Sequence, residues 1–374
     1  MGDTDRVVRE LIARGAYDPD ARDAADRRKL VDFLVGLGAT ADDIAAAGDE
    51  LARVATDLIL RGEGERFTRA EFAQRAGVTE ETAVHFWRAI GLPDPGPDAL
   101  AFSDEDVEAL RSATAAVDLL GADAAFQLIR VIGSSLARIA DAEVGAFLTN
   151  VGGPLFEADP SGLELARANA TAAVLLRGAG QAIDVALRRH VEAAQRPLMV
   201  GSQDTIQVAV GFADLVGSTA LAQDLPFAEL GSLIAEFEAR SIDTIVGIEG
   251  RAVKFIGDEV MFAVSDPAAG CEIALRLAEQ FSGHARLPAV RVGLAFGDVL
   301  TRDGDYFGPA VNLAARIVKR GAPNESLVSA AVATKLGGST EYAFTSRGTT
   351  HLAGIREPEE LFTLERHDRR GNDE

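Results

Sequence analysis

The spacing of apolar residues changes at Thr205. Before this residue, apolar side chains recur at helical spacing, as in Leu30, Phe33, Leu34 and Leu37, and strand-like alternation is scarce. After it, short runs rich in β-branched and aromatic residues are interspersed with helical patterns. The two patterns indicate two domains, as does the length of 374 residues.

The N-terminal pattern predicts helix after helix. A long helical pattern from about Leu163 to Ala194 ends near Pro197, and Gly and Pro occur mainly at junctions between such patterns. We therefore expect an all-helical domain over residues 1–190, a linker over 191–204, a second domain over 205–365 and a flexible tail over 366–374.

The C-terminal pattern predicts an α+β fold. Its elements follow the order of the ferredoxin-like βαββαβ motif, with a tight turn at Gly257, Asp258 and Glu259 between the second and third strands. The expected elements are strand 206–212, helix 227–248, strands 252–255 and 260–264, helix 268–281, strand 289–296 and a further helix 309–319.

The composition is strongly acidic. With 58 Asp and Glu against 37 Lys and Arg, the net charge is −21, which argues against affinity of the whole protein for nucleic acid or an anionic membrane. The single cysteine, Cys271, excludes an intramolecular disulfide and fits a reducing cytosol. Residues 1–16 lack the apolar stretch of a signal peptide, and no run of 18 apolar residues occurs. We therefore expect a cytoplasmic protein without a membrane span.

Two aspartates lie where predicted strands end. Asp214 follows the first strand, and Asp258 lies in the predicted hairpin turn. If these strands are neighbours, both carboxylates project from one end of the sheet, where hard oxygen ligands suit Mg²⁺ or Mn²⁺. Gly217-Ser218-Thr219 then opens a helix whose free N–H groups suit phosphate oxygens. Taken singly, Asp214 also fits a helix N-terminal residue, and Asp258 also fits a turn former.

Four motifs occur together in this domain. They are Phe212-x-Asp214-x-x-Gly217-Ser218-Thr219, Lys254-x-x-Gly257-Asp258, Arg291-x-Gly293-x-x-x-Gly297-x-Val299 and Asp305-x6-Asn312-x3-Arg316. In this order and spacing, residues 204–365 resemble the class III adenylyl cyclase catalytic domain. The short stretch from Gly297 to Asp305 resembles the subclass with an abbreviated dimerisation arm.

The resemblance implies a cytoplasmic adenylate cyclase, a lyase that forms 3′,5′-cyclic AMP and pyrophosphate from ATP. It implies a homodimer whose active sites lie at the subunit interface, with the metal ligands from one chain and the other functional residues from its partner. The implied roles are metal binding for Asp214 and Asp258 (two Mg²⁺ or Mn²⁺ ions), purine recognition for Lys254 and Asp305, ribose orientation for Asn312 and transition-state stabilisation for Arg316.

The chemistry of cyclisation agrees with these roles. The ribose 3′-oxygen attacks the α-phosphorus in line, so charge develops on phosphoryl oxygens that a metal pair and a guanidinium can neutralise. Asn312 and Arg316 are four residues apart on one predicted helix and share a face. Adenine offers an acceptor at N1 and a donor at its amino group, which match the donor Lys254 and the acceptor Asp305. Guanine reverses this pattern, so the pair predicts ATP rather than GTP.

Arg356 has two interpretations. Arg356 lies near a position where related enzymes bind terminal phosphates with a basic residue; its other interpretation is a solvated hairpin arginine.

Residues 67–112 resemble the helix-turn-helix of MerR-like regulators. Glu80 and Glu81 would lie at the tip of its recognition helix, where they disfavour DNA binding. We therefore expect a scaffold for protein contacts and regard DNA binding as unlikely.

The layout of the chain resembles bacterial cyclases with an N-terminal autoinhibitory helical domain, some of which respond to pH. His190 lies beside Arg188 and Arg189 on the helix that leads to the catalytic domain. A histidine there can change charge between pH 5 and 8, which makes His190 a candidate pH switch. The alternative is an ordinary exposed helix histidine.

Three other functions compete with the cyclase prediction. One is a DNA-binding regulator with a nucleotide-sensing domain. Another is a diguanylate cyclase, whose characteristic turn is similar to residues 256–260, but the first glycine and the phenylalanine of that turn are missing. The third is a non-enzymatic nucleotide-binding module, which is disfavoured because all six matched functional residues are present.

Overall fold

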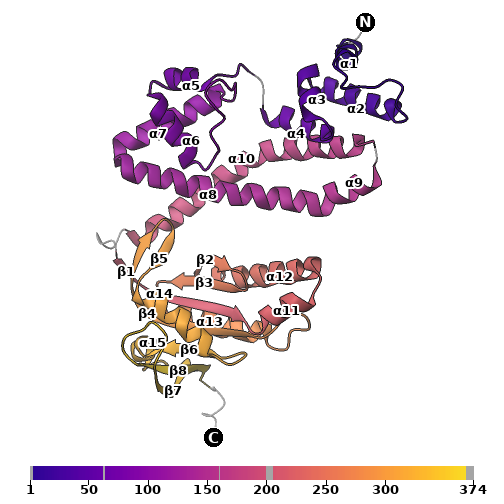
Figure 1. Cartoon of the computed structure of the whole chain (residues 1–374). Helices are drawn as coiled ribbons and strands as arrows, with labels where there is room; N and C mark the ends of the chain where they lie inside the picture. The colour runs from indigo at the N-terminus through magenta and orange to yellow at the C-terminus, as the bar shows by residue number, and fades with distance from the viewer. Residues whose placement is uncertain (1–2, 62–63, 160, 199–204, 368–374) are drawn as a thin grey trace. The chain divides into compact units, whose positions relative to one another are not determined.

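The computed structural model describes residues 3–61, 64–159, 161–198 and 205–367. It divides the chain into two units, residues 1–200 and 201–374, which Figure 1 follows by colour along the chain. Residues 199–204 of the expected linker and residues 368–374 of the expected tail lie outside the described residues.

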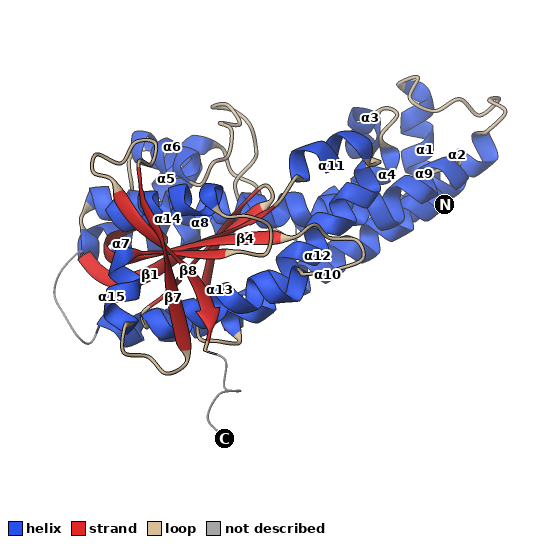
Figure 2. Ribbon diagram, turned by 90° about the horizontal axis from the view of Figure 1, so that it is seen from below, coloured by secondary structure: helices blue, strands red, loops and turns tan. Residues whose placement is uncertain are grey.

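The described part of the first unit is built from helices (Figure 2). Three of them begin with a capping box, in which a Thr or Ser side chain and a carboxylate three residues later bond each other's backbone N–H groups; the pairs are Thr40–Asp43, Thr68–Glu71 and Ser103–Asp106. The elements are α1 (Asp3–Ala13), α2 (Ala24–Gly36), α3 (Ala41–Ala47), α4 (Leu51–Arg61), α5 (Arg69–Ala76), α6 (Glu80–Ala89), α7 (Asp104–Leu120), α8 (Ala122–Phe147), a π-helical turn (Leu148–Gly152), α9 (Gly153–Ala158) and α10 (Leu163–Leu198).

Two separate apolar clusters stabilise the first unit. One joins α1–α4 to the start of α10, where Ala166 and Ala170 are buried. The other lies among α5–α8, around Phe72 and Phe102, whose rings stack with their centroids 4.3 Å apart. Gly133 of α8 permits a close approach to the end of α6, because a Cβ there would lie 2.1 Å from the carbonyl oxygen of Ile90.

Helix α10 is the longest helix described. Its segment Leu163–Ala194 is long enough to span a membrane and contains an 18-residue stretch with a mean hydropathy of 1.2, of which 6% is buried. Length and composition alone are weak evidence, because core helices and signal sequences pass the same test. The expected lack of a membrane span therefore stays a prediction.

The second unit contains one mixed sheet, in the order β2-β3-β1-β4-β6-β8-β7, with β5 paired to β4. Its pairings are antiparallel except for β4 with β6. The elements are β1 (Thr205–Leu215), α11 (Ser218–Asp224), α12 (Phe227–Val246), β2 (Arg251–Ile256), β3 (Glu259–Val264), α13 (Pro267–Phe281), β4 (Val290–Arg302), β5 (Asp305–Phe307), α14 (Pro309–Ile317), a 3₁₀ turn (Val318–Arg320), β6 (Ser326–Ser329), α15 (Ala330–Leu336), β7 (Tyr342–Thr350) and β8 (Glu359–Arg366).

Helices pack on both faces of this sheet. Phe237 of α12 packs in one apolar cluster with Phe262 of β3. Ile317 of α14 packs in another cluster with Phe212 and Met261. Because neighbouring residues of a strand point to opposite faces, the clusters around Met261 and Phe262 lie on opposite sides of the sheet.

The predicted α+β fold is confirmed. The ferredoxin-like core runs β1-α12-β2-β3-α13-β4, as expected. The helix expected to open at Gly217-Ser218-Thr219 is present as α11. The structure extends β4 from the predicted end at residue 296 to Arg302, and it adds β5–β8 and α15, which were not predicted from the sequence.

Candidate active site

Asp214 and Asp258 lie together at one end of the sheet. Asp214 stands near the end of β1, opposite Glu259 of β3, and Asp258 occupies the turn between β2 and β3. The backbone N–H of Leu215 donates a 3.2 Å hydrogen bond to the carbonyl oxygen of Asp258. The two residues that the sequence proposes as metal ligands are therefore adjacent.

Two cations bind the carboxylate of Asp214, which is 3% exposed. Arg291 of β4 donates to Oδ2 from Nε at 2.7 Å and from Nη2 at 2.5 Å. Lys319, in the 3₁₀ turn after α14, donates to Oδ1 at 3.0 Å and to Oε2 of Glu259 at 2.5 Å. Both oxygens of this buried carboxylate are thus charge-paired, as burial of an ionised group requires.

The ionisation of this cluster follows from its contacts. Burial raises the pKa of Glu259, and the hydrogen bond and charge of Lys319 oppose that rise. Burial lowers the pKa of Lys319, but its hydrogen bonds to Glu259 and Asp214 outweigh this effect, so its pKa lies above the ordinary value. Lys319 is therefore a permanent cation at neutral pH.

The sequence analysis missed the contacts of Arg291 and Lys319. Arg291 belongs to one of the four motifs, but the sequence assigned it no function. The antiparallel pairing of β1 with β4 places it opposite Asp214. Lys319 lies in the 3₁₀ turn after α14, and no local pattern in the sequence predicts its contact with Asp214. Its position also depends on Gly293, where a Cβ would lie 2.3 Å from the backbone nitrogen of Val318.

Asp258 has a different environment from Asp214. It is partly exposed, and its carboxylate accepts a short hydrogen bond from the hydroxyl of Ser218. Ser218 is the first residue of α11, which follows Gly217 in the left-handed conformation (φ 79°). The helix expected after Gly217 is present, although it has seven residues and is separate from α12.

Lys254 and Asp305 form an ion pair. Lys254 lies on β2, and Asp305 is the first residue of β5. The backbone N–H of Tyr306 fixes the other carboxylate oxygen of Asp305 with a 2.8 Å hydrogen bond. The donor and acceptor proposed for base recognition are therefore brought together within one chain.

Asp214 and Lys254 lie on the same face of the sheet. Lys254 is paired with Met261, and Met261 with Phe212, which lies two residues before Asp214 on β1. Directly opposite residues in antiparallel strands, and residues two apart on one strand, point to the same side. This side is the one on which α14 packs.

Asn312 and Arg316 lie on α14 and are both exposed. The helix buries Ala310, Ala314 and Ile317, so its polar pair is free to meet a ligand or another chain.

Arg356 is exposed in the segment between β7 and β8, and His190 is exposed on α10. Contacts within the described units therefore assign no role to Arg356 or His190.

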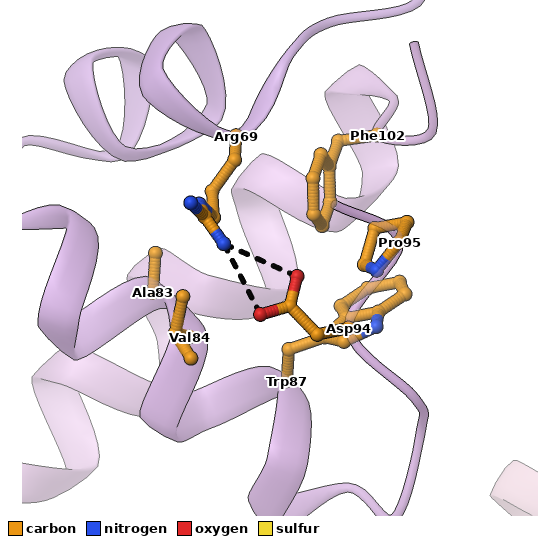
Figure 3. A pocket seen from close by; sticks show the side chains of 7 residues that line it. All are labelled: Arg69, Ala83, Val84, Trp87, Asp94, Pro95 and Phe102. Atoms are coloured by element: carbon orange, nitrogen blue, oxygen red, sulfur yellow. Dashed lines mark hydrogen bonds and ion pairs between the residues drawn. The ribbon is translucent and has the colours of Figure 1, made fainter. Parts of the chain in front are cut away.

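Residues 67–112 contain α5, α6 and the start of α7, with Gly77 (φ 75°) between α5 and α6. Figure 3 shows a small pocket beside α6 in which Arg69 and Asp94 face each other. Arg69 pairs with Asp94 at 3.1 Å and with Glu80 at 3.5 Å, and Arg88 pairs with Asp94 at 3.5 Å. These carboxylates neutralise cations that phosphate binding would need.

Both units match known family models. Residues 200–366 match the adenylate and guanylate cyclase catalytic domain, and residues 5–188 match the adenylate cyclase regulatory domain. The second unit is thus a nucleotidyl cyclase catalytic domain, as its resemblance predicted.

Relatives align over most of the chain. An adenylate cyclase of Streptomyces coelicolor is 36% identical over 79% of this chain and 78% of its own length. An uncharacterized protein of Mycobacterium tuberculosis H37Rv is 34% identical over 93% of this chain and 94% of its own. A pH-sensitive adenylate cyclase of M. tuberculosis CDC 1551 is 30% identical over 91% and 88%. The chain belongs to the family of adenylate cyclases that join this regulatory domain to this catalytic domain.

Proposed function

We propose that this protein converts ATP to 3′,5′-cyclic AMP and pyrophosphate. The observation that carries the proposal is the ion pair between Lys254 and Asp305, in which Lys254 lies on the same face of the sheet as Asp214. Family membership supports the reaction class, and this ion pair supports adenine as the base. The proposal is tested by incubating the full chain with ATP or GTP and Mn²⁺ and identifying the cyclic product.

Lys254 and Asp305 would recognise the adenine edge. The ammonium of Lys254 donates to N1, and the carboxylate of Asp305 accepts from the 6-amino group. Both side chains are partly exposed, at 38% and 24%, so a base can reach them. In the absence of a purine, each of these two groups has the other as its hydrogen-bond partner.

The donor set at the end of the sheet fits Mg²⁺ or Mn²⁺. Asp214 and Asp258 offer hard carboxylate oxygens, and Mg²⁺ commonly uses one or two carboxylates together with substrate phosphates. When bound, two such ions would neutralise the phosphoryl oxygens and activate the 3′-hydroxyl. The chain's part is to hold the two carboxylates adjacent through the Leu215–Asp258 hydrogen bond.

Asn312 and Arg316 would serve a site shared with a second copy. Both are exposed on α14, where Asn312 could orient the ribose and Arg316 could stabilise charge on the transferred phosphoryl group. Leu300 and Phe307 of the β4–β5 hairpin leave apolar side chains 39% and 48% exposed. A homodimer would cover such side chains and bring each aspartate pair to its partner's Lys254, Asp305, Asn312 and Arg316. Arg356 is a further candidate for binding the terminal phosphates.

The helical unit is proposed to regulate the catalytic pair through α10. This helix ends at Leu198, close in sequence to the start of β1, so a change in its length or angle would displace whole catalytic domains. His190 is the candidate proton acceptor on it. Arg188 pairs with Asp184 at 2.6 Å, and Arg189 pairs with Glu192 at 3.0 Å. Protonation of His190 would therefore act on the packing of α10 against other parts of the dimer.

A further inference from the structure

Lys319 is the one lysine that contacts a proposed metal ligand in the described part of the chain. Its ammonium lies 3.0 Å from Oδ1 of Asp214 and 2.5 Å from Oε2 of Glu259. Arg291 holds the other oxygen of Asp214. Asp214 therefore has its charge balanced by the protein itself.

The two cations on Asp214 differ in how firmly they are held. Arg291 donates two hydrogen bonds to Oδ2, and its side chain is 25% exposed. Lys319 donates one hydrogen bond to Oδ1, and its side chain is 49% exposed. A carboxylate has about four acceptor positions, so Arg291 can stay when Asp214 binds a metal. The charge of Lys319 at Oδ1 opposes a divalent ion at the same oxygen.

Glu259 offers Lys319 a second partner. It stands directly opposite Asp214 in the β1–β3 register, and its side chain is 12% exposed. A small movement of the ammonium can therefore break the bond to Asp214 and keep the bond to Glu259. The rigid backbone contact at Gly293 and Val318 keeps Lys319 within reach of both carboxylates.

We propose that Lys319 is a positioning residue that serves as an internal counter-ion. It pairs with Asp214 while the metal site is empty and moves to Glu259 when Asp214 binds a divalent cation. This inference rests on the proposed function of Asp214 as a metal ligand. Its consequence is that Lys319 weakens metal binding and stabilises the metal-free protein.

The test measures Mn²⁺ affinity of the full chain by electron paramagnetic resonance, using Mn²⁺ alone. Lys319→Gln keeps a hydrogen-bond donor but removes the charge, and should bind Mn²⁺ about tenfold more tightly. Arg320→Gln is the matched control, because Arg320 is the next residue and donates instead to the backbone oxygen of His351. Its affinity should stay within about twofold of wild type. Mn²⁺ should also raise the Tm of Lys319→Gln more than that of wild type.

The outcomes separate the two levels of the proposal. If wild type and Asp214→Asn bind Mn²⁺ equally, both the metal assignment and the role of Lys319 are wrong. If wild type binds through Asp214 but Lys319→Gln binds no more tightly, only the role of Lys319 is wrong. Should Lys319→Gln not fold, a crystal structure of wild type with Mn²⁺ decides: Lys319 must have left Asp214 and remained on Glu259.

Discussion

The backbone N–H of Leu215 is bonded to the carbonyl oxygen of Asp258 at 3.2 Å, which joins the end of β1 to the β2–β3 turn. This bond brings together the backbones next to two aspartates whose side chains have different environments. Asp214 is buried between Arg291 and Lys319, whereas Asp258 is partly exposed and bonded to Ser218. The two aspartates should therefore respond differently to substitution.

Asp258→Asn should abolish cyclase activity and leave the Tm within a few degrees of wild type, because it changes a partly exposed turn. Asp214→Asn should abolish activity and also lower stability by about 1–3 kcal/mol, because the amide keeps only one acceptor oxygen and turns its NH2 group toward the other charged donor. Cyclic AMP production and thermal melting measure the two effects. Near-normal activity in folded Asp258→Asn would exclude its role as a metal ligand.

Mixed chains test the shared-site dimer. Asp258→Ala and Arg316→Ala should each be inactive alone, and mixing them should restore up to about a quarter of wild-type activity, because only a heterodimer has one intact site. Asp258→Ala mixed with Asp214→Ala is the control and should stay inactive. Subunit exchange must be verified by a tag on one chain. Exchange without recovery contradicts a site built from two chains.

Cys271 gives a prediction about pH. Burial raises the pKa of its thiol to about 12, and the thiolate is the reactive form. In the folded protein Cys271 should therefore resist alkylation at pH 8, and it should react once the chain is denatured. Because the pKa of the buried thiol lies above that of an exposed cysteine, its contribution to stability is full below pH 9 and declines as pH rises toward 12. Rapid labelling of the native protein at pH 8 would show that the α13 core is open.

The proposed pH switch is tested by the pH–activity profile of the full chain between pH 5 and 8. His190→Ala should reduce the change in cyclase activity between pH 5 and pH 8. The expected reduction is about tenfold, which is the effect of a difference of about one pKa unit between two states of one side chain. His351→Ala is the control, since His351 is also exposed but lies in the catalytic unit. A His190→Ala profile that superimposes on wild type would remove this residue from the switch.

Sequence periodicity was sufficient for the central strands and helices because their apolar faces are fully buried, as at Phe237 and Phe262. It was also sufficient for the adjacency of Asp214 and Asp258, since both follow from strand ends. It was insufficient for β6–β8 and α15, which are short or partly exposed and carry weaker alternation. The helix that opens at Gly217-Ser218-Thr219 and the helix that begins at residue 227 were both expected, and they are present as α11 and α12.

The contacts of Lys319 could not be obtained from local pattern. They depend on the close packing of the 3₁₀ turn over Gly293 and on the pairing of β1 with both β3 and β4. A lysine near the C-terminus of a helix is ordinarily a solvated residue that interacts favourably with the negative end of the helix dipole. Only tertiary structure shows that this one lies between Asp214 and Glu259.

The ratio of kcat/KM for ATP to that for GTP tests the central claim most directly. Wild type with Mn²⁺ should form cyclic AMP and prefer ATP. Exchanging Lys254 and Asp305 for a guanine-compatible pair should lower kcat/KM for ATP by at least about 10²-fold, because each unmade buried hydrogen bond costs about 1–3 kcal/mol. Arg251→Lys, beside the pair but bonded to the carbonyl oxygen of Gly304, should keep the preference. Unchanged ATP kinetics in the exchanged variant, or a wild-type preference for GTP, would contradict the assignment.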